Sequence, residues 1–332
     1  MINETNIDIK RQRFDEALRV NESFDTVRRD IITCGKKCSF YFVDGLTKDE
    51  VMLRIMDLFM KLKELDVSSI SALKAFYDTY IPYVEVEGAK DGNAVITGVL
   101  SGMTAMMVDG ISGAVLIDCR TYPVRGIEEP ENDKVLRGAR VGFVETLVFN
   151  AALIRRHIRD VRLTMKIKTV GTSSKTDVVL CYLDGVADKK LISRIEQKID
   201  SIKVPCLSLG SESLAECLIK TGWYNPFPKI RYTERPDAAC ASILEGSIIV
   251  LCDNSPEALI LPTSIFDFMQ ETNDFYFPPL TGSYLRIVRY IIFFMTLLFM
   301  PLWLIAIHNP EAVPPWLEFV LPQEMGKLPI IV

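Results

Sequence analysis

The feature that most constrains the fold of this chain is an internal repeat. A β-strand, an Asp-Gly turn and an amphipathic helix are predicted from Phe40 onwards and again from Leu180 onwards, so that Asp44 coincides with Asp184. A second pattern, in which a helix ends at a glycine and two short apolar strands follow, begins at Leu100 and recurs at Leu244. Because the two patterns recur in the same order and at nearly the same separation, they predict a tandem duplication.

The duplication predicts an α/β fold of two tandem related modules, each with a small mixed sheet and helices, joined by a helix and followed by one transmembrane helix. The predicted boundaries are an N-terminal helical segment at residues 1–35, a first α/β module at 36–135, a connecting basic helix at 136–161, a second α/β module at 162–275, a transmembrane helix at 284–308 and an interfacial tail at 309–332.

The connecting segment is apolar on one side and basic at its end. Apolar residues recur every three or four positions over 142–158, which predicts a helix with one buried face. Arg155, Arg159 and Arg162 fall on one face if the helix extends that far. Two interpretations stay open: salt bridges with the acidic loop 128–133 together with helix capping, or binding of anionic lipid headgroups or an acidic partner subunit.

A run of 18 residues without a charge, 290–307, predicts a membrane-spanning helix, because at 1.5 Å per residue it is about as long as the bilayer hydrocarbon is thick. The alternative is a buried core helix. Arg286 and Arg289 precede the run, and the positive-inside rule then predicts that the N-terminal region lies in the cytosol. Trp303 and Trp316 are expected at the far interface of the membrane.

The chain offers little material for catalysis or metal binding. It has two histidines and eight scattered cysteines, which is neither a disulfide framework nor a zinc pattern. The stretch 171–177 lacks the spacing of a phosphate-binding loop and is predicted to be a hairpin loop. A formal net charge of −5 and the absence of an aromatic stacking platform argue against nucleic acid. We therefore expect no enzymatic activity, no cofactor and no metal.

One long stretch is specific to a known family. The sequence "RTYPVRGIEEPENDKVLRGARVGFVETLVFNAALIRRHIRD", from Arg120 to Asp160, strongly resembles the signature region of the A-subunit family of bacterial spore germination receptors. Further agreement lies in "YFVDG" from Tyr41, "KTDVVLCYLDGVAD" from Lys175 and "NPFPKIRYTERPDAA" from Asn225. The resemblance extends over essentially the whole chain from about residue 14.

The resemblance implies a cytosolic N-terminal region of two α/β subdomains, followed by a membrane domain in the spore inner membrane. It also implies partners: other copies of the chain, small membrane subunits of the germination machinery and the lipid membrane. The family supplies no catalytic residues. The signature residues that we assign to a subunit or lipid interface are Arg137, Arg140, Glu145, Asn150, Arg155, Arg156 and Arg159.

The expected function is that of a membrane protein of spore germination, the cytosolic region and first span of an ion-release channel subunit. The family carries further transmembrane helices after the first, so we expect that the rest of the membrane domain is absent from these residues. An alternative is the A subunit of a nutrient germinant receptor, which signals instead of conducting. A third is a membrane-tethered small-molecule sensor.

Overall fold

The computed structural model describes residues 4–61, 73–121, 141–219, 229–264, 266–267 and 279–309. The chain divides into two compact units, residues 1–264 and 265–332. The first unit holds both α/β modules, and the described part of the second includes one long helix. Each unit is described by itself below.

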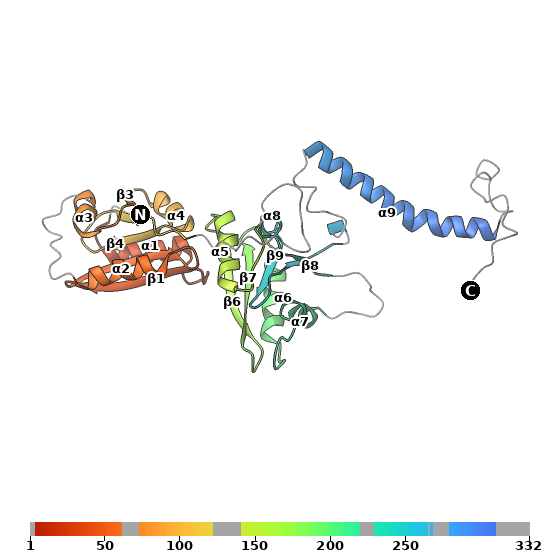
Figure 1. Ribbon diagram of the computed structural model, residues 1–332, viewed down its shortest axis with the longest axis horizontal. Coiled ribbons are helices and arrows are strands. Elements are labelled where there is room, and N and C mark those ends of the chain that lie inside the picture. Colours follow the sequence, from red (N-terminus) through yellow and green to blue (C-terminus); the bar gives the residue numbers. More distant parts are fainter. Residues whose placement is uncertain are drawn as a thin grey trace. The chain divides into compact units, whose positions relative to one another are not determined.

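The first module is a five-stranded sheet with helices on both faces (Figure 1). Its elements are α1 (Ile7–Leu18), β1 (Thr26–Thr33), β2 (Lys36–Val43), α2 (Asp49–Lys61), α3 (Leu73–Tyr80), β3 (Val86–Ala89), α4 (Gly92–Leu100), β4 (Thr104–Val108) and β5 (Ala114–Ile117). The strand order is β1-β2-β4-β5-β3. The β1–β2 hairpin turns at Cys34 and Gly35, which both have a positive φ, so the tight turn uses the left-handed conformation that glycine adopts readily.

The second module repeats this architecture. Its elements are α5 (Leu147–His157), β6 (Leu163–Val170), β7 (Thr176–Leu183), α6 (Lys189–Asp200), α7 (Ser211–Leu218), β8 (Arg231–Thr233), α8 (Pro236–Leu244), β9 (Ile248–Cys252) and β10 (Ala258–Leu261). The strand order β6-β7-β9-β10-β8 is that of the first sheet, element for element. The predicted fold class, two related α/β modules in tandem, is thereby confirmed.

Apolar side chains cover both faces of each sheet, as the long buried stretches of the central strands require. All five residues of β4 and all five of β9 are buried, which is the pattern of a strand between two helical layers. In the first module one core lies between the sheet and α2 and α3, and the other between the sheet and α1 and α4. In the second module the corresponding layers are α6 with α7 and α5 with α8.

The structure corrects three details of the predicted architecture. Every strand pair among the described residues is antiparallel, where mixed sheets were expected. The short hairpins allow only antiparallel neighbours, and the longer excursion from β2 to β4 also returns antiparallel. The N-terminal segment is helical only over α1, because residues 26–33 pair along their whole length with β2. The connecting helix begins at Leu147, since residues 141–146 are extended or irregular.

The second unit contains α9 (Pro279–His308), which includes the predicted span. The most apolar 18-residue window within Leu280–His308 has a mean hydropathy of 2.4, and none of that window is buried. A core helix of a soluble domain would instead be mostly covered by its own protein. The helix is therefore long and apolar enough to cross a membrane.

Candidate functional site at the junction of the modules

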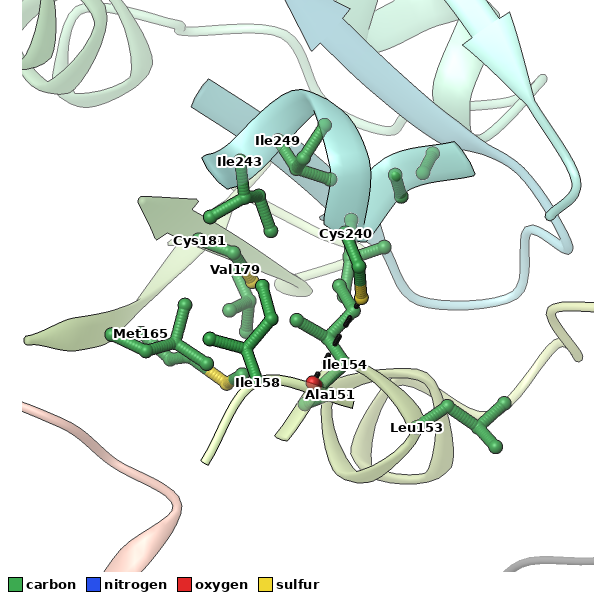
Figure 2. Close-up of a cluster of buried hydrophobic side chains, with 14 of the residues drawn as sticks. Ala151, Leu153, Ile154, Ile158, Met165, Val179, Cys181, Cys240, Ile243 and Ile249 are labelled. Atoms are coloured by element: carbon green, nitrogen blue, oxygen red, sulfur yellow. Dashed lines mark hydrogen bonds between the residues drawn. The ribbon is translucent and has the colours of Figure 1, made fainter. Parts of the chain in front are cut away.

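Helix α5 belongs to the cores of both modules. Its N-terminus is fixed by Asp253, whose Oδ1 accepts a hydrogen bond from the Leu147 amide at 3.2 Å. Figure 2 shows Ile154 and Ile158 pointing toward Val179 and Cys181 of the second sheet. Ala152, in contrast, packs in the core of the first module. A single short helix is thus shared, and this sharing brings the two modules into direct contact.

A buried ion pair crosses this junction. Arg155 on α5 and Asp25, just before β1, are each 1% exposed, and Nε of Arg155 lies 2.6 Å from Oδ2 of Asp25. Nη2 of Arg155 lies 3.0 Å from the other carboxylate oxygen and donates further to Ser23 Oγ and the Leu163 carbonyl, while Nη1 donates to the Asp160 carbonyl. This fork geometry uses every nitrogen of the guanidinium group, which is what makes burial of the charge tolerable.

The backbone of the first module also pairs with the edge of the second sheet. The Phe24 amide donates to the Met165 carbonyl at 3.1 Å, and the Met165 amide donates to Ser23 Oγ at 3.1 Å. Met165 lies on β6, a strand that is paired along only one side within its own sheet. The phenyl ring of Phe24 packs against the core of the second module, and Val161 packs against the core of the first. The contact is therefore apolar and hydrogen-bonded at once.

Two further contacts complete the junction. Arg19, the C-cap of α1 with a left-handed backbone, donates to Asp184 Oδ2 at 2.7 Å and to Thr164 Oγ1 at 3.0 Å. The hydrogen bond from Arg19 holds the pKa of the Asp184 carboxyl below its usual value. Gly45 lies against α5 so closely that a Cβ atom there would stand 3.0 Å from Ala152 Cβ and 3.1 Å from Val148. The turn after β2 and helix α5 can approach each other only because residue 45 is a glycine.

The predicted site residues divide into buried and exposed groups. Asn150 is fully buried, and its amide both accepts from the Val144 amide at 2.8 Å and donates to the Val144 carbonyl. It fixes the chain that leads into α5, so neither lipid nor a second subunit reaches it. Glu145, Arg156 and Arg159 are exposed. Arg137, Arg140 and Trp316 lie outside the described residues.

The predicted basic face of α5 does not form. The helix ends at His157, so Arg159 and Arg162 follow it in irregular chain and do not share a face with Arg155. Arg162 binds Asp160 at 2.7 Å instead. The sequence predicted that Arg155 lies at a subunit or lipid interface. Its side chain is instead buried and joins the two modules. The acidic loop 128–133, its other suggested partner, lies outside the described residues.

Arg286, Arg289 and Trp303, which are predicted to lie at the membrane boundary, are all on α9 and are half-buried. Near the N-terminal half of this helix, Phe266 and Tyr290 make an edge-to-face ring contact with centroids 5.7 Å apart.

The described residues show no arrangement that points to metal or thiol chemistry. No group of three or more His, Cys, Asp or Glu side chains in that part of the chain could hold a metal ion. Burial raises the pKa of the Cys38 and Cys240 thiols to about 12, and it raises the pKa of Cys181 as well. Cys240 Sγ contacts the Ile154 carbonyl at 3.9 Å within the core (Figure 2). These cysteines are neutral packing residues at physiological pH.

Sequence reasoning missed the residues of the first module that bind the second module across this junction. Asp25, Ser23 and Arg19 carry no local pattern that sets them apart, and Asp25 lies 130 residues from its partner in the chain. Gly45 did offer a signal, because it belongs to an Asp-Gly turn that is present in both repeats. The turn itself was predicted; its contact with α5 was not.

The fold and the junction define a class of protein: a unit of two duplicated α/β modules that share one helix, on the same chain as a helix apolar enough to span a membrane. The family model described as "Bacillus/Clostridium GerA spore germination protein" matches residues 12–332. The chain belongs to this family of spore germination proteins, as the signature region predicted.

Two relatives and one solved structure show how far the similarity extends. Stage V sporulation protein AF of Bacillus subtilis (strain 168) is 35% identical over 96% of this chain and 64% of its own length. Spore germination protein GerLA of Bacillus cereus is 29% identical over 80% of this chain and 54% of its own length. The chain thus spans less than two thirds of these relatives.

The solved structure is the N-terminal domain of the A subunit of the Bacillus megaterium spore germinant receptor GerK3. It superposes with a TM-score of 0.60 and 23% identity, covering 80% of this chain and 98% of that domain. At this identity the likeness concerns the fold alone.

Proposed function

We propose that this chain is the cytosolic region and first membrane span of an ion-release channel subunit that acts during spore germination, and that it has no enzymatic activity. The observation that carries this proposal is the match with stage V sporulation protein AF, which exceeds the match with GerLA in both identity and coverage. The apolar, uncovered α9 supports the membrane assignment.

The duplicated unit suits a structural role, in which it transmits a change of arrangement, better than a catalytic role. The buried Arg155–Asp25 pair at the junction holds one module to the other. In the proposed role the rigid unit lies on the cytosolic side of the spore inner membrane, beside other copies and small partner subunits. It transmits their arrangement to the membrane helices.

The test is deletion of the complete gene in the spore-forming host, with potassium release and germinant response measured on the same spores. A channel subunit predicts slower potassium release after germinant addition, with the germinant concentration dependence unchanged. Normal potassium release from the deletion spores would refute the channel role. A shifted germinant concentration dependence with normal release from each germinated spore would instead establish the alternative, the A subunit of a nutrient germinant receptor.

A further inference from the structure

Helices α2 and α6 occupy the same place in the two modules, but their exposed residues differ. Each helix follows the Asp-Gly turn of its repeat and covers one face of its own sheet (Figure 1). Over residues 51–60 and 191–200 the two helices are buried, half-buried and exposed at the same positions. Three buried apolar residues hold each helix to its sheet. The fold therefore places the same requirements on both helices and does not explain why their exposed faces differ.

The exposed face of α6 is basic. Lys189, Lys190 and Arg194 are exposed there, and the side chains of Lys190 and Arg194 form no hydrogen bond or ion pair within the described part of the chain. Lys189 lies near Asp184, but Arg19 already binds that carboxylate at 2.7 Å. Both lysines stand in the first turn of α6, where the helix dipole disfavours a positive charge. Their charge therefore does not serve the stability of the helix itself.

The exposed face of α2 combines acidic and apolar residues. Asp49 and Glu50 stand at the positions that the two lysines occupy in α6, and neither carboxylate has a hydrogen bond or an ion pair among the described residues. Leu53 and Met60 lie seven residues apart, and thus on the same side of the helix, with exposed fractions of 70% and 65%. At the corresponding positions α6 has a serine and an aspartate. Apolar side chains grouped on one exposed face indicate a surface that another molecule covers.

The two faces are complementary in charge and in polarity. The lysines at the start of α6 match the carboxylates at the start of α2, and the aliphatic stems of long basic side chains are suited to cover Leu53 and Met60. Both faces are exposed in the single chain, so neither covers the other there. An anionic membrane surface would attract α6 but repel the acidic start of α2. A second copy of the chain accounts for both faces.

We propose that the basic face of α6 in one copy of this chain docks on the acidic and apolar face of α2 in a neighbouring copy. Because the two surfaces differ, the contact is heterologous, and contacts of this kind build rings when the rotation between copies closes. The inference deepens the proposed function and rests on it in one respect, namely that copies of the chain lie side by side. The experiment measures self-association alone, so its failure would leave the potassium-release test unaffected.

The experiment is sedimentation equilibrium of the full chain in a density-matched non-ionic detergent, which measures the dissociation constant of self-association. We expect the double change K189E/K190E to raise this constant at least about tenfold, because like charges then face each other. The double change D49K/E50K should raise it as well, although it moves the net charge from −5 toward zero, which by itself favours association. Far-ultraviolet circular dichroism checks that each variant is folded.

The matched control is K90E/K175E. Lys90 and Lys175 are exposed and lie on neither helix, and their replacement changes the net charge as much as K189E/K190E does. We expect this control to associate like the wild-type chain. Leu53→Ser adds a variant without a change of charge: it introduces the residue found at the same position of α6, on an exposed site where the fold tolerates it, and it should also weaken association.

Two combinations test whether the two faces bind each other. A chain with all four charge changes should regain self-association, because the charges are then exchanged between the faces. A mixture of the K189E/K190E and D49K/E50K chains should associate where each chain alone does not, since every contact between unlike chains joins opposite charges. A wild-type chain that stays monomeric, or equal dissociation constants for K189E/K190E and K90E/K175E, would overturn the proposal. A monomeric wild-type chain that binds phosphatidylglycerol vesicles through Lys189 and Lys190 would also overturn it and assign α6 to the membrane surface.

Discussion

At the scale of single residues, the junction depends on the buried charge of Arg155. Burying a guanidinium group costs several kcal/mol, and Arg155 recovers this cost only through its carboxylate partner and three further hydrogen-bond acceptors. Asp25, in turn, accepts from Arg155 and from the Ser23 hydroxyl. Each of the two residues therefore keeps the buried charge of the other paired.

We predict that Asp25→Asn lowers the free energy of unfolding by about 3–5 kcal/mol, because it leaves the Arg155 charge buried without its counter-charge. Urea titration of the full chain in detergent, followed by far-ultraviolet circular dichroism, measures this loss. The control is Asp57→Asn: Asp57 pairs with Lys61 on the surface of α2, and such pairs contribute about 0–1 kcal/mol. Similar losses in the two variants would mean that the buried pair stabilises the chain no more than a surface ion pair does.

Gly45 allows a second comparison inside one chain. Gly45 and its repeat partner Gly185 have φ values of 76° and 82°, so an alanine at either position is strained to a similar degree. Only at Gly45 would the new methyl group also press on Ala152 and Val148. We predict that Gly45→Ala destabilises the chain clearly more than Gly185→Ala, by roughly 1–3 kcal/mol for the added overpacking. Equal urea midpoints for the two variants would contradict the close approach to α5.

At the scale of elements, the two modules cap the N-terminus of their first helix in the same way. Asp109, after β4, accepts from the Ile7 amide at the start of α1 at 3.2 Å, and Asp253, after β9, does the same for Leu147 at the start of α5. A carboxylate from a distant turn thus caps the first helix of each module. This position at the positive end of the helix dipole favours a negative charge.

From this equivalence we predict that Asp253→Ala and Asp109→Ala each lower the free energy of unfolding by about 0.5–2 kcal/mol, the usual range for a lost helix cap. The loss at Asp253 should be at least as large, because α5 supports both modules and α1 only the first. The two alanine variants are compared by urea titration with Asp91→Ala, whose side chain caps α4 locally through Asn93. Wild-type stability of the Asp253→Ala chain would rule out this cap.

The sequence predicted the elements that repeat and missed those defined by distant pairing. Matched turns such as Asp44-Gly45 and Asp184-Gly185 contain their own signal, so the repeated α/β modules could be inferred from spacing alone. Strand β1, in contrast, has charged residues at its centre, and the partner that makes it a strand is β2. The start of α5 depends likewise on Asp253 and on the Asn150 side chain, neither of which is apparent from local periodicity.

At the scale of the whole unit, the junction determines whether the two modules behave as one body. Their cores are separate clusters on separate sheets, which alone would allow independent unfolding. Yet Ala152 of α5 belongs to a core of the first module, and the Arg155–Asp25 pair cannot separate without exposing two unpaired charges to a partly apolar interface. Breaking the junction therefore costs a substantial share of the stability of either module.

We predict that the two sheets of the full chain open together. In hydrogen exchange measured by mass spectrometry over a urea series, peptides from β2 and β7 should share one opening free energy in the wild-type chain. In Asp25→Asn the two values should separate, because each module then opens without the other, while Asp57→Asn should leave them equal. If β2 and β7 already open with clearly different free energies in the wild-type chain, the shared helix and the buried pair do not couple the modules, and the proposed rigid cytosolic unit loses its physical basis.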